Sequence, residues 1–135
     1  MSVYQSLFSS DFTKAEFDLF KVKIKTAKDM EKLMKEDVDG YRAWNMYGTL
    51  YEGLGVLVRE GLIDVRLPAQ LMSGMILQFW GDYREAIVDA RREWKWPRGN
   101  VEVEYLAEAV AKYGREHPEL GIASPEVSYV ESMRK

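Results

Sequence analysis

The fold is decided by residues 41–96, which read YRAWNMYGTLYEGLGVLVREGLIDVRLPAQLMSGMILQFWGDYREAIVDARREWKW. The apolar runs 41–60 and 65–94 are each long enough to form a helix. Between them, Gly61 fits the left-handed position that commonly ends a helix. Asp64 can then cap the second helix, and Pro68 is tolerated within its first turn. Because this connection is so short, the two helices are predicted to be antiparallel neighbours.

Reflecting one helix onto the other about this turn predicts which residues face each other. The reflection places Gly48 opposite Phe79, Gly55 opposite Met72, and Tyr51 opposite Ile76. Glycine inside a helix costs about 1 kcal/mol relative to alanine. Three glycines in one helix, at positions 48, 53 and 55, therefore indicate close packing against bulky side chains. The same glycines could suggest a phosphate-binding loop, but the required Gly-Lys-Ser/Thr ending and preceding strand are missing.

Two further helices are predicted outside the hairpin. An amphipathic helix over residues 9–37 opens at Ser9-Ser10-Asp11, with a capping-box pattern at 13–16, and ends at Asp39-Gly40. Its apolar stripe consists of Phe17, Phe20, Ile24, Ala27, Met34 and Val38. After the breaker Pro97-Arg98-Gly99-Asn100, residues 101–116 form the last helix, with Leu106, Ala109, Val110 and Tyr113 on one side.

These elements predict an all-α protein, a three- to four-helix bundle built on a long antiparallel helical hairpin. We expect residues 1–118 to form a single domain. Residues 119–135 would be a tail, either flexible or docked on a partner through Val127, Tyr129 and Val130.

Composition excludes several kinds of chemistry. The 135 residues include no cysteine, so disulfides, thiolate nucleophiles and cysteine-bound metals are ruled out. The single histidine, His117, precedes Pro118, and we expect it to lie near a helix C-terminus rather than to bind a metal or act as a base. The formal net charge of −3 gives no general attraction to nucleic acid or anionic lipid. With no signal peptide and no transmembrane segment in view, we expect a cytoplasmic protein without a cofactor.

Polar side chains within the hairpin offer two candidate sites. Glu52 falls near Gly74 and Met75 in the pairing scheme. It would either lie on an exposed strip or, if buried, have a raised pKa and serve as a general acid. We favour the exposed strip and expect no enzyme. Asn45 and Asp82 face each other in the same scheme, where they could fix the helix register or bind a small ligand.

The segment 91–98, RREWKWPR, contains four cations and two indoles. Cations near a helix C-terminus are favoured by its dipole, and tryptophans pack under arginine stems, so the segment can be purely structural. Stacking on nucleic acid and insertion at a membrane interface are the alternatives. The residues selected as a possible interaction surface are Phe20, Ile24, Arg91, Arg92, Trp94, Trp96 and Arg98.

Residues 51–64, YEGLGVLVREGLID, followed by Phe79-Trp80 and Arg91-Arg92, resemble the core of a family of small prokaryotic helical domains of unknown function. The resemblance covers residues 41–94, a little under half of the chain. It implies the helical hairpin. Because the family has no established activity, it implies no catalytic residue.

The aromatic and methionine content, with Trp 4, Tyr 8, Phe 5 and Met 7, exceeds what a small bundle readily buries. We therefore expect a non-catalytic interaction or assembly domain that self-associates as a homodimer, using the narrow stripe of the first helix and the tail. The alternative is a nucleic-acid-binding transcriptional regulator. The acidic balance and the lack of a basic recognition helix argue against that alternative.

Overall fold

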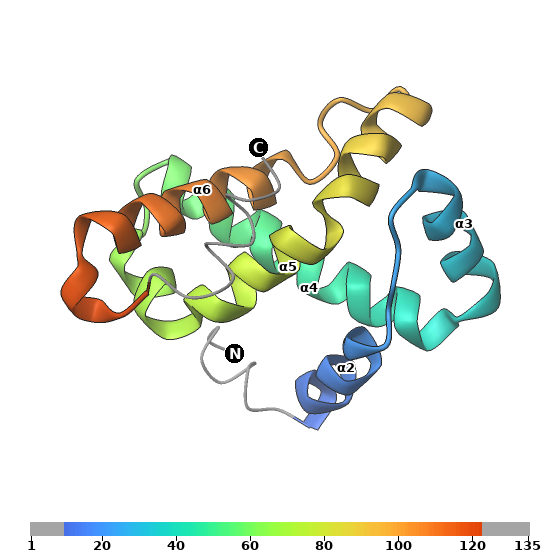
Figure 1. Ribbon diagram of the computed structural model, residues 1–135, viewed down its shortest axis with the longest axis horizontal. Coiled ribbons are helices and arrows are strands. Elements are labelled where there is room, and N and C mark those ends of the chain that lie inside the picture. The colour runs from blue at the N-terminus through green and yellow to red at the C-terminus, as the bar shows by residue number, and fades with distance from the viewer. Residues whose placement is uncertain (1–9, 123–135) are drawn as a thin grey trace.

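The computed structural model describes residues 10–122, which form five α-helices and one short 3-10 helix, with no strand among them (Figure 1). The elements are α2 (Ser10–Phe20), α3 (Ala27–Glu36), α4 (Val38–Arg59), α5 (Arg66–Glu93), α6 (Val101–Glu116) and η1 (Pro118–Leu120). α4 and α5 run in opposite directions, and α6 packs closely against both. The predicted all-α bundle is confirmed.

The turn between α4 and α5 forms as predicted. Gly61 adopts φ +74°. Its amide donates to the Val58 carbonyl at 3.0 Å, and the next amide donates to the Leu57 carbonyl at 2.9 Å. This pair of hydrogen bonds is the Schellman ending of a helix. At the start of α5, the Asp64 carboxylate accepts from the Arg66 amide at 2.8 Å, and Pro68 lies in the first turn.

The predicted close approach of α4 and α5 at glycines is only partly right. Aromatic side chains join these helices, with Phe79 at 5.2 Å from Tyr51 between ring centroids. Gly48 does lie near Phe79, because a Cβ there would be 3.7 Å from that ring. Gly55, however, faces α6 rather than Met72. A Cβ on Gly55 would overlap the backbone of Glu102. A Cβ on Gly53 would meet nothing within 4 Å, so that glycine serves no close contact.

The first predicted helix is two helices. Residues 21–25 alternate exposed lysines with Val22 and Ile24, which are both buried. This two-residue period is typical of extended chain and breaks the helix. Thr26 then begins α3, since its side chain accepts from the Asp29 amide while the Asp29 carboxylate accepts from the Thr26 amide. The predicted capping box at 13–16 is wrong, because those residues lie inside α2.

α4 begins three residues earlier than predicted. Asp37 caps it by accepting a hydrogen bond from the Gly40 amide at 3.0 Å. Asp39-Gly40 therefore lies in the first turn of α4 instead of separating two helices.

α5 bends at Met72, whose φ of −151° is not helical. Beyond η1, Ile122 is buried against Gly114 of α6. The predicted apolar cluster at Val127, Tyr129 and Val130 lies outside the described residues.

The core is formed mainly by α4, α5 and α6. Its most deeply buried large side chains are Trp80, Tyr51, Ile76, Leu77, Ile87, Leu106, Val103 and Val110. Within residues 10–122, no helix is both long enough and apolar enough to cross a membrane.

Candidate functional site

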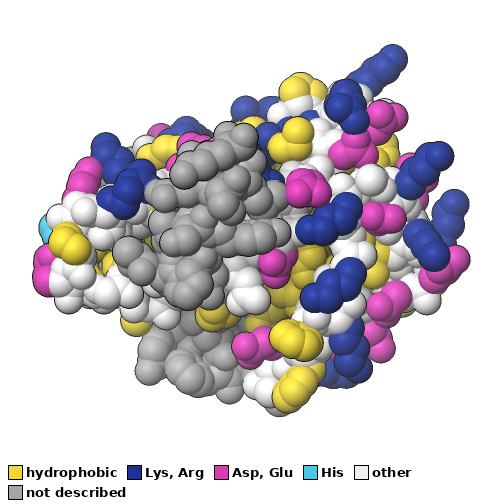
Figure 2. Space-filling view, in the orientation of Figure 1, with side chains coloured by type: hydrophobic (Ala, Val, Ile, Leu, Met, Phe, Trp, Pro, Cys, Tyr) yellow, Lys and Arg dark blue, Asp and Glu magenta, His cyan; other side chains and the backbone are white. Residues whose placement is uncertain are grey.

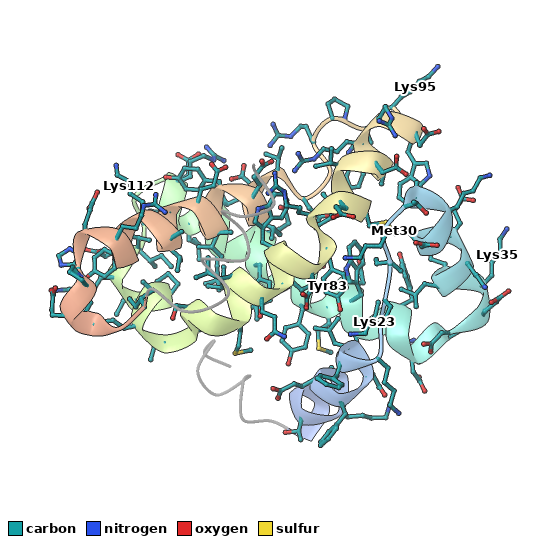
Figure 3. The ribbon with its side chains drawn as sticks, viewed as in Figure 1. Lys23, Met30, Lys35, Tyr83, Lys95 and Lys112 are labelled. Carbon is teal, nitrogen blue, oxygen red and sulfur yellow. The ribbon has the colours of Figure 1, made fainter. Side chains whose placement is uncertain are left out.

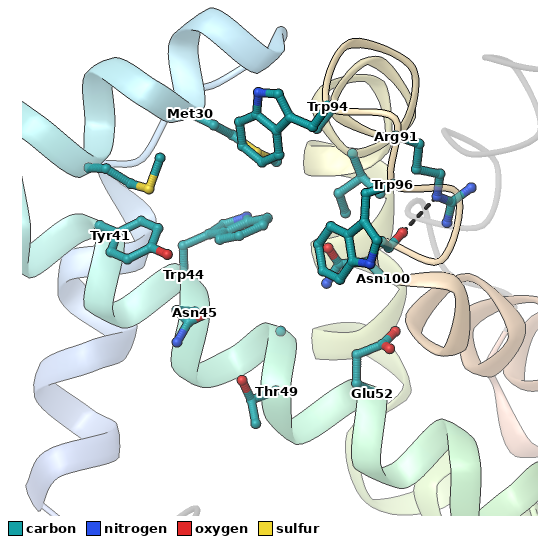
Figure 4. Close-up of a pocket in the computed structure, with 15 residues that line it drawn as sticks. Met30, Tyr41, Trp44, Asn45, Thr49, Glu52, Arg91, Trp94, Trp96 and Asn100 are labelled. Atoms are coloured by element: carbon teal, nitrogen blue, oxygen red, sulfur yellow. Dashed lines mark hydrogen bonds between the residues drawn. The ribbon is translucent and has the colours of Figure 1, made fainter.

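A pocket of about 300 Å³ lies where α3, α4 and the α5–α6 turn meet (Figure 4). Four aromatic side chains line it: Tyr41, Trp44, Trp94 and Trp96. The lining also includes methionines of α3 and polar side chains of α4, α5 and the turn: Met30, Met34, Asn45, Thr49, Glu52, Arg91 and Asn100. The pocket thus combines aromatic walls with a few polar groups, as small-molecule sites commonly do.

Trp44 is held rigidly in the wall. Its side chain is 8% exposed and stacks on Phe79, with ring centroids 6.1 Å apart and planes 25° apart. The ring of Tyr83 meets it edge-on at 6.3 Å. Tyr83 is itself fixed, since its hydroxyl donates to the Leu19 and Val22 carbonyls at 3.2 Å. Contacts with α5, itself fixed to the end of α2 and to the chain that follows α2, therefore set the position of this indole.

Trp94 and Trp96 are brought to the pocket by the end of α5. The Trp96 amide donates to the Arg91 carbonyl at 2.9 Å and the Lys95 amide to the Arg92 carbonyl at 3.3 Å, which is again a Schellman ending. Lys95 occupies the left-handed position, with φ 51°, and its side chain points away from the molecule (Figure 3). The two indoles remain 38% and 54% exposed and form the rim. Trp94 Nε1 donates to Glu31 at 3.2 Å, which ties the rim to α3.

Glu52 lies beside α6, and the predicted position near Gly74 and Met75 is wrong. Its Oε1 accepts from the Val103 amide at 2.7 Å, and its side chain is half-buried. Desolvation is the largest influence on its carboxyl group and raises the pKa, to which the nearby Glu102 adds. Hydrogen bonds from the amides of Val103 and Glu102, together with the charge of Arg91, oppose that rise in the Glu52 pKa.

Arg91 fastens the turn that follows α5. Its Nε donates to the Gly99 carbonyl at 2.6 Å, and its Nη1 donates to Glu104 at 2.9 Å. The guanidinium carbon lies 6.0 Å from the centroid of the Trp80 ring. Glu104 matches the charge of Arg91, which anchors the pocket rim, but Nη2 is buried and has no hydrogen-bond partner among the described residues.

The predicted interaction surface does not form one patch. Phe20 is 76% exposed on α2, whereas Ile24 is only 3% exposed, so the predicted shared stripe is wrong. Arg92 pairs with Asp89 on the surface of α5. Arg98 lies 3.6 Å from Glu102. Of the selected residues, only Arg91, Trp94 and Trp96 meet at the pocket.

The other predicted polar groups are also separated. Asn45 lines the aromatic pocket, while Asp82 lines a second pocket of about 140 Å³ beside α2. These two residues were predicted to face each other, but they line different pockets. His117 lies at the end of α6, with Nδ1 3.2 Å from Glu119. Among residues 10–122, no group of three or more His, Asp or Glu side chains could hold a metal ion.

The comparison with known families matches residues 2–110 to "Domain of unknown function (DUF4760)". This chain belongs to the DUF4760 family. The match confirms the expected family of unknown function and extends well beyond the hairpin, from residues before α2 to the middle of α6. Every residue that lines the aromatic pocket lies inside the DUF4760 domain. No curated protein and no solved structure matches the chain.

Proposed function

We propose that this DUF4760 domain works by binding rather than by catalysis, and that it takes a ligand into the aromatic pocket. One observation carries the proposal: four aromatic side chains from two separate segments, Tyr41, Trp44, Trp94 and Trp96, line a single pocket. Keeping large indoles partly exposed forgoes hydrophobic stabilisation, and clustered exposed apolar surface commonly marks a binding site.

The polar lining supports binding more than chemistry. Glu52 has a structural contact, because its Oε1 accepts a hydrogen bond from the Val103 amide at the start of α6. The uncharged polar groups of the lining are the hydroxyl of Thr49 and the side-chain amides of Asn45 and Asn100. Such groups orient a ligand by hydrogen bonding and are weak acids and bases.

The size of the pocket limits what it can hold. Its volume of about 300 Å³ lies at the lower end of the range for ligand sites, which runs from about 300 to 1,000 Å³. A small molecule, or one side chain of a partner, fits this volume. A dinucleotide-sized cofactor does not.

The binding proposal can be tested with a panel of small organic cations, anions and neutral aromatic compounds, using the unfolding midpoint of the full chain as the readout. We expect one class to raise the midpoint of the wild-type protein and to have little effect on Trp96→Ala. Tyr105→Ala is the matched control, since Tyr105 is an exposed aromatic residue of α6 outside the pocket. A panel without any stabilising compound, or equal stabilisation of Trp96→Ala, would contradict the proposal.

Self-association is the second part of the proposal, and α2 supplies its surface. Phe17 and Phe20 are 71% and 76% exposed. Residues three apart on a helix share a face, and Figure 2 shows hydrophobic side chains at the surface over α2, flanked by charged ones. We propose that two copies cover these rings in a two-fold dimer.

Sedimentation velocity tests this dimer. At micromolar concentration we expect a dimer for the wild-type protein and a monomer for the double variant Phe17→Ser, Phe20→Ser. Leu62→Ser is the control, because Leu62 is equally exposed at the distant α4–α5 turn. A wild-type monomer at high concentration would rule out self-association.

Nucleic-acid binding is less well supported than self-association. The carboxylate of Glu104 pairs with Arg91, and that of Glu102 lies beside Arg98, so neither arginine is an unmatched positive charge.

A further inference from the structure

We propose that the aromatic pocket recognises a compact organic cation whose charge sits on a methylated nitrogen, a quaternary or trimethylated ammonium group. The inference rests on the proposed function, that the pocket is a ligand site, and adds the chemical class of the ligand. Three features of the pocket support it: the arrangement of its rings, the carboxylates beside it and the apolar groups of its lining.

The rings bound the pocket in different planes. Trp44 is seen edge-on, whereas Trp94 and Trp96 are seen closer to face-on (Figure 4). A flat ligand stacks best between parallel rings. A rounded cation can instead touch several faces at once, and each face carries the negative part of the ring quadrupole. Walls in different planes therefore favour a methylated ammonium over a flat heterocycle.

The charged groups around the pocket favour a cation. Glu52 extends from α4 toward Trp96 and Asn100 (Figure 4), and Glu31 lies at the rim, 3.2 Å from the Trp94 indole nitrogen. Among the described lining residues the only cation is Arg91, whose Nη1 is paired with Glu104 at 2.9 Å while its Nη2 is buried without a hydrogen-bond partner. An anionic ligand would meet the carboxylate of Glu52, whereas a cation would stabilise its ionised form.

The apolar part of the lining favours a methylated cation over a plain one. A lysine ammonium brings three donors and an arginine guanidinium five, and each donor needs an acceptor once it is buried. The lining supplies acceptors on Glu52, where the Val103 amide already uses Oε1, and on its amide and hydroxyl side chains, but its aromatic rings and methionines supply none comparable. A methylated nitrogen needs few acceptors or none. The ring faces and the Met30 thioether can surround its methyl groups.

The direct test is calorimetric titration of the full chain with choline and, separately, with 3,3-dimethylbutan-1-ol, an uncharged compound of the same shape. We expect choline to bind at millimolar or lower concentration and at least about tenfold more tightly than the alcohol. Equal affinity for the two compounds would overturn the cation inference while leaving the pocket as a ligand site. Lack of choline binding, with another class of the panel stabilising the protein, would overturn it as well. If no compound binds, the proposed function fails together with the inference.

Variants assign the binding to the pocket. Trp96→Ala removes one wall and Glu52→Gln removes the charge, and each should weaken choline binding roughly threefold to thirtyfold. Tyr105→Ala should bind choline as the wild type does. Because Glu52 also contacts α6, Trp96→Ala, at an exposed side chain, keeps the test valid if Glu52→Gln fails to fold. Unchanged choline affinity in Trp96→Ala would overturn the inference.

Two peptides distinguish the source of the cation. One carries a trimethyllysine, and the other carries the unmodified lysine at the same position. Tighter binding of the trimethylated peptide than of choline would identify a side chain of a protein partner. Tighter binding of choline would identify a free quaternary ammonium compound, and the lysine peptide should bind weakest. If the unmodified peptide binds as tightly as the trimethylated one, the requirement for methylation is wrong.

Discussion

The carboxylate of Glu52, in the middle of α4, accepts a hydrogen bond of 2.7 Å from the backbone amide of Val103 in the first turn of α6. The first amides of a helix have no partner within the helix. The residue before α6, Asn100, has φ 54° and makes no side-chain cap. The Glu52 side chain of α4 therefore supplies the acceptor that a capping residue of α6 would otherwise supply. The same carboxylate lines the aromatic pocket, so α6 and the pocket are joined through one residue.

Replacing Glu52 should weaken the attachment of α6. Glu52→Ala leaves the Val103 amide without its acceptor, and we expect it to lower the free energy of unfolding by about 1–2 kcal/mol. Glu52→Gln keeps an oxygen acceptor and should lose less. Urea denaturation monitored by circular dichroism at neutral pH measures both. Equal losses for the two variants would show that the hydrogen bond to Val103 contributes nothing.

The pH dependence of stability should also change in Glu52→Gln. Desolvation raises the pKa of Glu52 above its ordinary value of 4.5, so the folded protein holds this proton at pH values where the unfolded chain has released it. Stability contributed at this site therefore falls as pH rises through that window, and glutamine removes the effect. The stability of Glu52→Gln relative to the wild type should rise as the pH increases above 4.5 and level off once Glu52 is ionised in the folded protein. A relative stability that falls with pH would contradict the direction of the shift.

Three glycines of α4 should respond differently to alanine. Gly53→Ala adds a methyl group in open space and should stabilise the helix by about 1 kcal/mol. Gly48→Ala meets its nearest atom, Asn100 Nδ2, at 3.4 Å and should be tolerated. Gly55→Ala would place Cβ 2.8 Å from the Glu102 carbonyl carbon and should cost about 3 kcal/mol or more, because backbone must move. Thermal unfolding ranks the three, and the reverse order for Gly53 and Gly55 would mean that α6 lies elsewhere.

Lys95 occupies the same position after α5 that Gly61 occupies after α4, and both have positive φ. A side chain in this conformation costs about 1–2 kcal/mol. Lys95→Gly should therefore stabilise the protein by about 1 kcal/mol, measured by urea denaturation. Lys112→Gly, in the interior of α6, is the control and should destabilise by a similar amount.

The hairpin could be predicted because its signals are local. Gly61, Asp64 and Pro68 each act on the backbone within a few residues, so the turn forms as their chemistry dictates. The break after α2 also had a local signal, the alternation of lysines with Val22 and Ile24. A stripe with steps of three and four passes through Ile24 as well, which is why a continuous helix was predicted.

The pocket could not be predicted from local patterns. Its lining residues come from separate segments, such as those of Met30, Trp44 and Trp96. The sequence-based pairing of α4 with α5 did not include contacts with α6. Gly55 and Glu52 both belong to the contact with α6, yet glycine spacing alone cannot say which helix fills the space. Only the cluster 91–98 gave a signal, and the structure shows that its indoles, rather than its arginines as a group, come together at the pocket.

The four indole N–H resonances of the chain test most directly whether the aromatic pocket is a ligand site. Trp44, Trp94 and Trp96 line the pocket, while Trp80 is buried in the core outside it and serves as an internal control. When ¹⁵N-labelled protein is titrated with choline, we expect the resonances of Trp44, Trp94 and Trp96 to shift with one common saturation curve and that of Trp80 to move least. An unchanged spectrum, or a shift of Trp80 as large as that of Trp96, would contradict the account.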